Sequence, residues 1–304
     1  MGEFDESAAT DVESHRGLLF SVAYRLVGAA HDAGDMVQET YSRWYQLNPD
    51  ERAEIVTPRA WLVRVASRIC LDHLGSARVR RESYVGDWLP EPLPGSLVAA
   101  SFGSGNNRGD PLHDITLDES VSTALLVLLE EVTPAERVTF ILHDVFGISF
   151  NDIADIVGRS AAACRQLAVS ARRHVRSDSP RRSLDPRDHS TVVSAFKDAC
   201  TSGNLDDLVI ALAPEVVARV DGGGNARAAL RPLVGADKVA RFLLGVIAKR
   251  PTSELVEREV NGKNGIVMIV DGHTVGVYSF DVAAGRIQTI WAVVNPDKLD
   301  IWND

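Results

Sequence analysis

Apolar positions in the first part of the chain recur at the spacing of amphipathic helices. One series stops at Gly28, a second runs to Trp44, and a third follows Thr57-Pro58, where a cap residue precedes a proline of the first helical turn. The apolar positions are Leu19, Val22, Ala23, Leu26 and Val27, then Ala33, Met36, Val37, Thr40, Tyr41 and Trp44, then Trp61, Leu62, Val65 and Ile69. Residues 14–82 are therefore predicted to form a small helical bundle.

A second helical block is predicted over residues 115–177. Thr133-Pro134-x-Glu136 is a capping signature that opens a helix running to Phe146-Gly147, and Ser149 opens a short helix that ends at Val157-Gly158. A tight turn then leads into the basic stretch "SAAACRQLAVSARRHVR". Two helices joined by a glycine-containing turn, the second strongly basic, are typical of a helix-turn-helix.

The pattern changes after residue 190. Two helices, the first over 191–202, are followed by runs rich in Val, Ile, Thr and Tyr, and another helix is predicted at about 236–249. Asn261-Gly262, Asp271-Gly272 and Ala284-Gly285 are hairpin signals between the later runs. This block is predicted to be α+β, with a curved antiparallel sheet and helices on one side.

Residues 84–114 separate the two helical blocks and begin with the stretch "DWLPEPLPG". Its prolines fix φ and remove backbone donors, so the first third is predicted to be stiff, whereas the following "AASFGSGNNRGD" reads as a flexible tether. Trp88 is an unusual residue for a mere spacer. It is interpreted as an anchor for the C-terminal block, the alternative being that it packs on its own helical bundle.

Composition narrows the class of protein. The chain has 304 residues, a net charge of −10 and three separated cysteines without metal-ligand or disulfide spacing. It lacks an apolar run long enough to span a membrane and a basic, apolar secretory leader, so a cytoplasmic protein is expected. Arginines nevertheless concentrate at 59–81 and 159–182, which predicts local basic faces on an acidic whole.

The two helical blocks resemble a known family. "AAHDAGDMVQETYSRWYQL" followed by "TPRAWLVRVASRICLDHLGSARVRRE" resembles the second conserved region of extracytoplasmic-function sigma factors, and "LLEEVTPAERVTFILHDVFGISFNDIADIVGRSAAACRQLAVSARRHV" resembles the fourth. The last block, from "VVSAFKDACTSGNLDDLVIALAPEVVARVDGGG", resembles the SnoaL-like branch of the NTF2-like fold. The implied architecture is multidomain: two all-α sigma domains, a helical bundle and a helix-turn-helix, followed by an α+β NTF2-like cone barrel. The expected boundaries are 1–83 for region 2, 84–114 for the linker, 115–180 for region 4 and 190–304 for the SnoaL-like domain.

The resemblance implies partners and site residues. One side of the helix over 32–46 is implied to dock on the clamp helices of the largest subunit of core RNA polymerase, and carboxylates with an amide suit an arginine-bearing surface. The helix after Pro58 is implied to meet the −10 promoter element, with the loop 47–57 holding an unstacked base, and the last helix of the second block to read the −35 element. The polymerase-binding residues are Asp35, Gln38 and Glu39; those for −10 are Arg59, Arg64, Arg68, His73, Arg78, Arg80 and Arg81; those for −35 are Ser160, Arg165, Gln166, Arg172, Arg173 and Arg176.

The residues predicted to contact the −35 element fall into two chemical groups. Arg165 and Gln166 have the reach to pair with guanine and adenine, while Arg172, Arg173 and Arg176 are expected to hold phosphates. Trp61 has the chemistry of a stacking platform for a base, but its phase with Leu62 and Val65 favours a place in the core.

Three further motifs resemble a subgroup of this family that carries a fused SnoaL-like domain. The chain has "WLPEP" in the linker, "DGGGN" in the last block, where the subgroup has lysine in place of Asn225, and "NPDKL" near the C-terminus. The resemblance implies that the fused domain replaces a separate anti-sigma factor and modulates the sigma regions in cis. Members of the family usually act as monomers bound to polymerase, but the sequence leaves the oligomeric state open. The interdomain residues are Trp88, Leu89, Pro90, Glu91 and Pro92; Asp221, Gly222, Gly223 and Gly224; and Asn295, Pro296, Asp297, Lys298 and Leu299.

Two other functions stay open at this stage. One is a helix-turn-helix regulator whose barrel senses a small molecule. The other is an NTF2-like enzyme, for which Asp221, Asp271, His273 and Tyr278 are the acid–base candidates, although His273 follows an Asp-Gly turn and is expected at an exposed hairpin end. The leading hypothesis is a non-enzymatic sigma factor with no catalytic residue, metal site or cofactor, and whether the barrel binds a ligand is left unknown.

Overall fold

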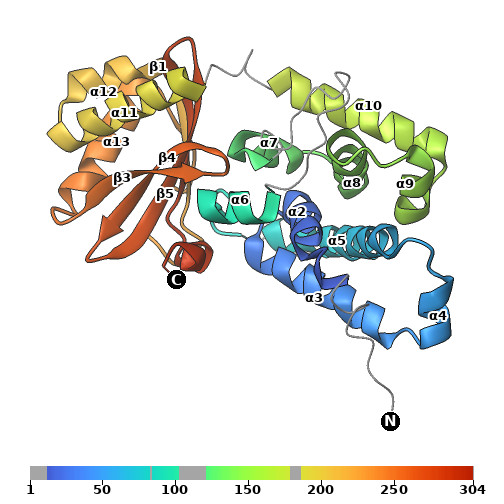
Figure 1. Cartoon of the computed structure of the whole chain (residues 1–304). Helices are drawn as coiled ribbons and strands as arrows, with labels where there is room; N and C mark the ends of the chain where they lie inside the picture. Colours follow the sequence, from blue (N-terminus) through green and yellow to red (C-terminus); the bar gives the residue numbers. More distant parts are fainter. Residues whose placement is uncertain (1–11, 83, 103–120, 179–185, 304) are drawn as a thin grey trace. The chain divides into compact units, whose positions relative to one another are not determined.

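The computed structural model describes residues 12–82, 84–102, 121–178 and 186–303. The chain divides into two units (Figure 1). The first comprises Met1–Arg80, Leu97–Val121 and Leu128–Asp178, and the second comprises Arg81–Ser96, Ser122–Val127 and Ser179–Asp304. The expected linker is thus divided: residues 84–96 fold with the C-terminal block, while residues 103–114 lie outside the described part of the chain.

The first helices of the first unit are those that the apolar pattern predicts. They are α2 (Arg16–Val27), α3 (Ala30–Gln46) and α5 (Pro58–Glu82). Trp61 is half-buried and packs edge-on against the buried Trp44, with ring centroids 5.2 Å apart, so it lies at the edge of the core. The expected loop 47–57 contains a short helix, α4 (Pro49–Glu54), because Asn48 and Glu51 form a capping box ahead of it.

The rest of the first unit contains the predicted helix-turn-helix. Its elements are α6 (Gly95–Phe102) and α7 (Thr123–Leu129), which each begin in the second unit, then α8 (Pro134–Phe140), a π turn η2 (Ile141–Val145), α9 (Phe150–Val157) and α10 (Ala161–Asp178). The predicted caps are confirmed: Thr133 and Glu136 form a capping box, Ser149 caps α9, and Gly158 ends α9 with φ 71°. Helix α6 extends into the predicted tether at residues 99–102, so the expectation of a flexible tether is wrong there; the apolar residues Leu97 and Val98, just before the tether, support the helix.

A buried arginine joins the two helical blocks inside the first unit. Arg137 is 3% exposed and donates hydrogen bonds to the backbone oxygens of Leu26, at 2.8 Å, and Leu129, at 2.8 Å. Its guanidinium also pairs with Glu130 at 2.6 Å. Burial lowers the pKa of Arg137, and these three acceptors compensate for the lost hydration of its charge. The last turn of α2 is therefore fixed to the start of the second helical block.

The second unit is the predicted α+β block. Three helices, α11 (Pro186–Ser202), α12 (Leu205–Ala211) and α13 (Ala236–Ala248), accompany six strands (Figure 1). The strands are β1 (Leu212–Asp221), β2 (Leu233–Val234), β3 (Glu254–Val260), β4 (Lys263–Val270), β5 (His273–Ala283) and β6 (Arg286–Val293), and 3-10 turns η3 (Pro296–Lys298) and η4 (Asp300–Trp302) end the described chain. All three predicted hairpin turns are present, with positive φ at Asn261, Asp271 and Ala284.

The sheet has the order β2-β1-β6-β5-β4-β3. The expectation of a purely antiparallel sheet is wrong at one pair, because β1 runs parallel to β6. The chain between these two strands contains α13 and the meander β3–β5, which is long enough for the crossover that a parallel pair requires.

Both faces of the sheet are covered. Helices α11, α12 and α13 pack on one face around a core that includes Phe196, Leu243 and Phe280. On the other face, Trp291, Val277 and Val267 form a smaller cluster with Leu89 and Leu299. The second face therefore receives the linker, the start of α7 through Ala124 and Val127, and the C-terminal turns.

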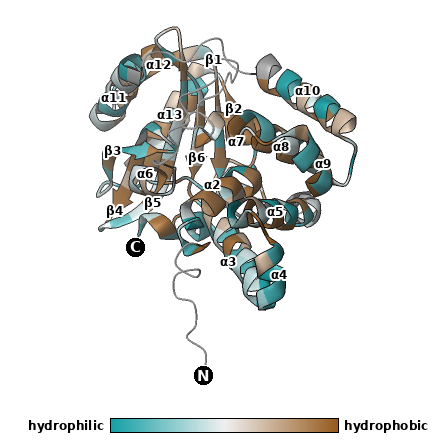
Figure 2. Cartoon of the chain, turned by 45° about the vertical axis from the view of Figure 1, so that its right-hand side comes forward, coloured by the Kyte–Doolittle hydropathy of each residue, from teal (hydrophilic) through white to brown (hydrophobic). Residues whose placement is uncertain are grey.

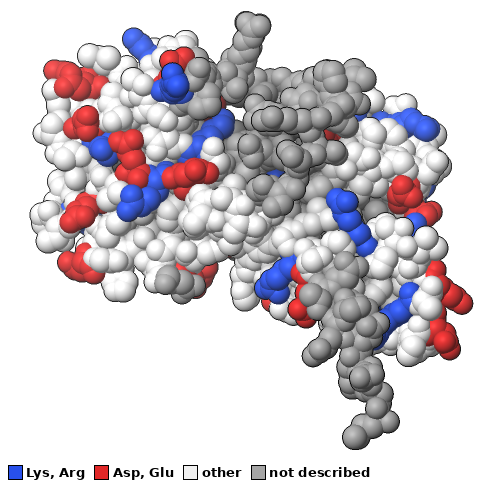
Figure 3. Space-filling view, viewed as in Figure 1, with Lys and Arg blue, Asp and Glu red and all other residues white. Residues whose placement is uncertain are grey.

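Polar and charged residues lie where these layers meet solvent. Figure 2 shows the strands largely hydrophobic and long hydrophilic stretches on α10 and α11. Acidic and basic side chains are interspersed on the face that Figure 3 presents, so the net charge of −10 is not gathered there into one acidic field. Among the described residues, no helix is both long and apolar enough to cross a bilayer.

Candidate functional site

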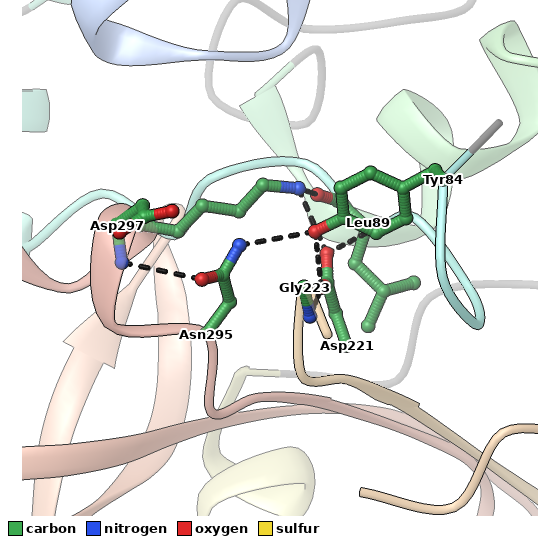
Figure 4. A network of polar contacts seen from close by, with 7 residues as sticks. Tyr84, Leu89, Asp221, Gly223, Asn295 and Asp297 are labelled. Atoms are coloured by element: carbon green, nitrogen blue, oxygen red, sulfur yellow. Dashed lines mark hydrogen bonds and ion pairs between the residues drawn. The ribbon is translucent and has the colours of Figure 1, made fainter. Parts of the chain in front are cut away.

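A buried carboxylate at the end of β1 receives the linker. Asp221 is 0% exposed and accepts four hydrogen bonds, from the Tyr84 hydroxyl at 2.6 Å, the Leu89 amide at 2.9 Å, the Gly223 amide at 3.1 Å and Lys298 Nζ at 2.8 Å. Figure 4 shows these groups converging from the linker, the β1 end and the C-terminal turn. Because every donor points at one carboxylate, its charge is compensated without water. We call Tyr84, Trp88, Leu89, Asp221, Asn295 and Lys298 the linker clamp.

Lys298 is the cation of the linker clamp. Besides the ion pair with Asp221, its Nζ donates to the backbone oxygen of Leu89 at 2.5 Å. It also lies 4.2 Å from the centre of the Trp88 ring and 5.3 Å from that of Tyr84. An ammonium over aromatic faces gains electrostatic attraction, most strongly over tryptophan. Trp88, an unusual residue for a spacer, thus covers the buried charge of Lys298.

Tyr84 and Asn295 complete the polar part of the linker clamp. The Asn295 amide nitrogen donates to the Tyr84 hydroxyl at 3.0 Å while its oxygen accepts from the Asp297 amide at 3.2 Å. Desolvation and, after it, the hydrogen bond to Asp221 raise the pKa of Tyr84, so the phenol stays protonated at neutral pH and acts as a donor.

Apolar and backbone contacts extend the docking of the linker. Leu89 is 1% exposed in the cluster beneath the sheet. Leu93 exchanges two hydrogen bonds with Asn261, from its amide to the Asn261 side chain and from the Asn261 amide to its oxygen, both at 2.9 Å. The Trp302 indole donates to the Pro92 oxygen at 2.8 Å. The linker therefore packs against this face of the sheet through both apolar and hydrogen-bonded contacts.

The glycines after Asp221 permit close approach. A Cβ at Gly222 would lie 2.7 Å from the oxygen of Ala226, and Gly223 has φ 61° with the Asn295 side chain against it. Asn225, where the subgroup has lysine, donates from its amide to Asp297 at 3.0 Å. A hydrogen bond from a neutral amide to a carboxylate thus joins the "DGGGN" and "NPDKL" motifs.

The structure brings the linker motif into contact with the other two motifs. Leu89, Asp221 and Lys298 meet in one network, and the Trp88 ring lies against Lys298. Pro90, Glu91, Pro92, Gly222 and Leu299 are buried, while Gly224, Pro296 and Asp297 are exposed. Tyr84, Asn261 and Trp302 also hold the linker, and none of them belongs to a predicted motif. The sequence predicts Asn261 only as a turn residue. For Tyr84 and Trp302 the available signal is their position, because Tyr84 shortly precedes "WLPEP" and Trp302 shortly follows "NPDKL".

The predicted polymerase-binding residues share one exposed face of α3. Asp35, Gln38 and Glu39 are exposed, while Ala33, Val37 and Thr40 on the opposite face are buried. Glu39 pairs with Arg43 at 2.9 Å and Asp35 lies 3.7 Å from His31, both on the same helix. These exposed intrahelical pairs are weak and leave the carboxylates accessible to a basic partner.

The predicted −10 residues lie along α5 but differ in environment. Arg59 and Arg68 are exposed, whereas Arg64 pairs with Asp155 of α9 at 2.8 Å and His73 lies 3.3 Å from Asp32 of α3. The side chains of Arg78, Arg80 and Arg81 lie outside the described residues. In this structure Arg64 therefore joins the two helical blocks.

The predicted −35 residues lie on α10 and its cap. Ser160 accepts a hydrogen bond from the Ala163 amide at 3.2 Å and so caps the helix. Arg165, Gln166 and Arg173 are exposed, and Arg165 lies 5.5 Å from the Phe150 ring. Arg172 instead makes a bidentate pair with Asp144, at 2.5 and 2.6 Å, so here it holds α10 on η2. The Arg176 side chain lies outside the described residues.

The acid–base candidates of the barrel do not meet. Tyr278 is buried with its hydroxyl 4.0 Å from the Met268 sulfur, and burial raises its pKa to about 12. His273 and Asp271 are exposed at a hairpin end, as predicted for His273, while Asp221 is part of the linker clamp. No catalytic dyad forms among these four.

Comparison with known proteins decides between the functions left open. Residues 12–80 match the model of Sigma-70 region 2 and residues 122–175 that of Sigma-70, region 4. The chain is 39% identical over 300 residues to the ECF RNA polymerase sigma factor SigJ of Mycobacterium tuberculosis, covering 95% of this chain and 92% of SigJ. The chain belongs to the extracytoplasmic-function sigma factors.

Two further comparisons agree with this assignment over nearly the whole length. The probable ECF RNA polymerase sigma factor SigI of M. tuberculosis is 37% identical over 288 residues, covering 94% of this chain and 93% of SigI. The crystal structure of M. tuberculosis SigJ superposes with a TM-score of 0.72 at 36% identity, covering 96% of this chain and 98% of that one. This sigma factor is a specificity subunit that binds core RNA polymerase and directs initiation at promoters, and it is not an enzyme.

Proposed function

We propose that this sigma factor is regulated in cis by its second unit, which restrains promoter use through the linker clamp and acts in place of a separate anti-sigma factor. The observation that carries the proposal is the ion pair of Asp221 and Lys298, buried around the Leu89 backbone. A covalently attached domain acts at a high effective concentration, so modest contact energy is enough to hold the linker.

The linker clamp limits the reach between the two DNA-reading regions. Regions 2 and 4 must separate to occupy two promoter elements, and the tether between them includes residues 84–96, which fold with the second unit. An extended segment spans about 3.3 Å per residue, so the full length of residues 84–96 is on the order of 40 Å, and docking fixes how much of that length the tether can use. Docking of the linker therefore favours a form in which both elements are not occupied together.

The remaining roles follow the predicted residues. Asp35, Gln38 and Glu39 face the clamp helices of the polymerase largest subunit, and charge complementarity supports this partner. Region 2 meets the −10 element through α5, and region 4 reads the −35 element through Arg165 and Gln166, with Arg173 on the phosphate backbone.

Run-off transcription by the full-length chain with core polymerase tests the proposal. Promoters are first selected from a genomic library with the wild-type holoenzyme. Lys298→Met is then expected to raise initiation severalfold, whereas Lys238→Met, which removes an exposed lysine of the same unit, should leave it unchanged. Equal or lower initiation with Lys298→Met would reject restraint by the linker clamp, and failure to initiate on any promoter would challenge the sigma function itself.

A further inference from the structure

Helix α10 carries an apolar side chain in the middle of its predicted DNA-reading face. Its buried stripe is already complete, with Cys164, Ala168, Ala171 and Val175 packed in the first unit. Val169 lies off this stripe and is 45% exposed. A single exposed valine is ordinary on a protein surface, so its neighbours decide what it means.

The neighbours of Val169 on the helix surface are those assigned to DNA. At about 100° per residue, Val169 lies about 40° around the helix from Arg165, and Arg173 follows after the same step. Gln166 is three residues before Val169, and Ala162, also exposed, lies seven residues before it. Val169 is therefore enclosed by two arginines and a glutamine on one solvent-facing stripe. A stripe with this charge favours DNA over an apolar protein partner.

The helix is held in a way that keeps this stripe outward. The bidentate pair of Arg172 and Asp144 fixes one side of α10 to η2, and the Asp144 side chain is only 12% exposed. Arg165 lies against Phe150 of α9, which orients its long side chain. Because these contacts occupy the flanks of α10, the exposed stripe from Ala162 to Val169 is the part of the helix that can enter the major groove.

We infer that Val169 is a further specificity-determining residue of this sigma factor, and that its isopropyl group contacts the 5-methyl group of a thymine in the −35 element. The inference rests on the proposed reading of the −35 element by α10. In the major groove the thymine methyl is the one apolar group that distinguishes a base pair, and apolar side chains recognise it. Val169 lies about 6 Å along the helix axis from Arg165, close to two base steps of 3.4 Å. The thymine is thus expected about two positions from the base that Arg165 contacts.

Replacement of single thymines by deoxyuridine tests the inference, because it removes only the methyl group. The −35 element is first selected from a randomised promoter library with the wild-type holoenzyme, and duplexes with one deoxyuridine each then compete for holoenzyme binding. Loss of one buried methyl contact corresponds to about a fourfold loss of affinity. One deoxyuridine should produce this loss with the wild type and leave Val169→Ala unaffected.

Matched variants give the controls. Arg165→Ala should keep the deoxyuridine effect while losing discrimination at a different base pair. Val234→Ala, which shortens a valine 50% exposed in the second unit, should behave as wild type. Val169→Thr retains the shape of the side chain and serves if Val169→Ala alters the helix; it should reduce the effect.

The outcomes separate this inference from the proposed function. Absence of thymine from the selected element, absence of any sensitive position, or an undiminished deoxyuridine effect in Val169→Ala would each overturn the role of Val169. Failure to select any −35 element would instead count against the reading of that element by region 4.

Discussion

Substitution of Lys298 by methionine gives a direct measure of what the linker clamp contributes. Methionine keeps an unbranched side chain of similar length but removes the ammonium that pairs with Asp221. The Asp221 carboxylate is then left fully buried with three of its four donors, the Tyr84 hydroxyl and the amides of Leu89 and Gly223. Removal of one partner of a buried ion pair costs about 3–5 kcal/mol, and the surviving donors place this variant near the lower value.

Hydrogen exchange of backbone amides in the full-length chain measures this loss of stability in the linker itself. The amides of Leu89 and Leu93 are bonded to Asp221 and Asn261, so they exchange only when the linker leaves the sheet. A loss of about 3 kcal/mol makes that opening about a hundredfold more frequent. Peptides covering residues 84–93 should therefore exchange about a hundred times faster in Lys298→Met, while peptides of α8 and α9 should keep the wild-type rate.

Two comparisons make the reasoning refutable. Asp221→Asn added to Lys298→Met removes the uncompensated charge, so the double variant should recover part of the lost protection. Lys238→Met should leave the exchange of the linker unchanged. Unchanged exchange of residues 84–93 in Lys298→Met, or strictly additive losses in the double variant, would show that the ion pair does not hold the linker.

Other predictions concern the rest of the chain. Asp281→Asn should raise the free energy of unfolding at pH 7 by on the order of 1 kcal/mol, because burial raises the pKa of Asp281 and its Oδ2 has no hydrogen-bond partner among the described residues. Asp281 favours folding below about pH 4 and loses that effect as pH rises, so urea titrations should show the gain fading toward pH 4. Arg137→Met should speed exchange in residues 16–27 by about a hundredfold, since it removes the donor to the last turn of α2. Charge reversal of Asp35 and Glu39 should abolish capture of core polymerase in a pull-down, while reversal of the exposed Asp72 should not.

Local signals explain how much of the fold could be predicted. Caps at Thr133 and Ser149, the stop at Gly158 and the turn at Asn261 each act through neighbouring backbone groups, so the sequence around them is sufficient. The parallel pairing of β1 with β6 joins strands far apart in sequence, and no local pattern distinguishes it from an antiparallel pair. Helix α4 was missed because a capping box at Asn48 was read as part of a loop.

The candidate site, too, could be predicted only in part from the sequence. Family motifs indicated that the linker meets Asp221 and Lys298, but the motifs do not show why an ion pair can be buried there. The answer lies in groups outside the motifs, such as the Tyr84 hydroxyl that donates to Asp221. Likewise, the pairing of Arg172 with Asp144 depends on two elements meeting in space, so a basic helix alone could not separate this arginine from Arg173.

Two restraints on the separation of the DNA-reading regions follow from these contacts, and they lie in different units. Arg137 fixes the end of α2 to the second helical block within the first unit, while the linker clamp shortens the tether within the second. Under the proposed regulation in cis, both contacts must open before regions 2 and 4 can occupy distant elements. Contacts that share no partner contribute independently to the free energy of the closed form, so binding of polymerase and DNA must supply the sum of the free energies of the two contacts. A partner that weakens only one of them would therefore shift the population of the separated form without opening it fully.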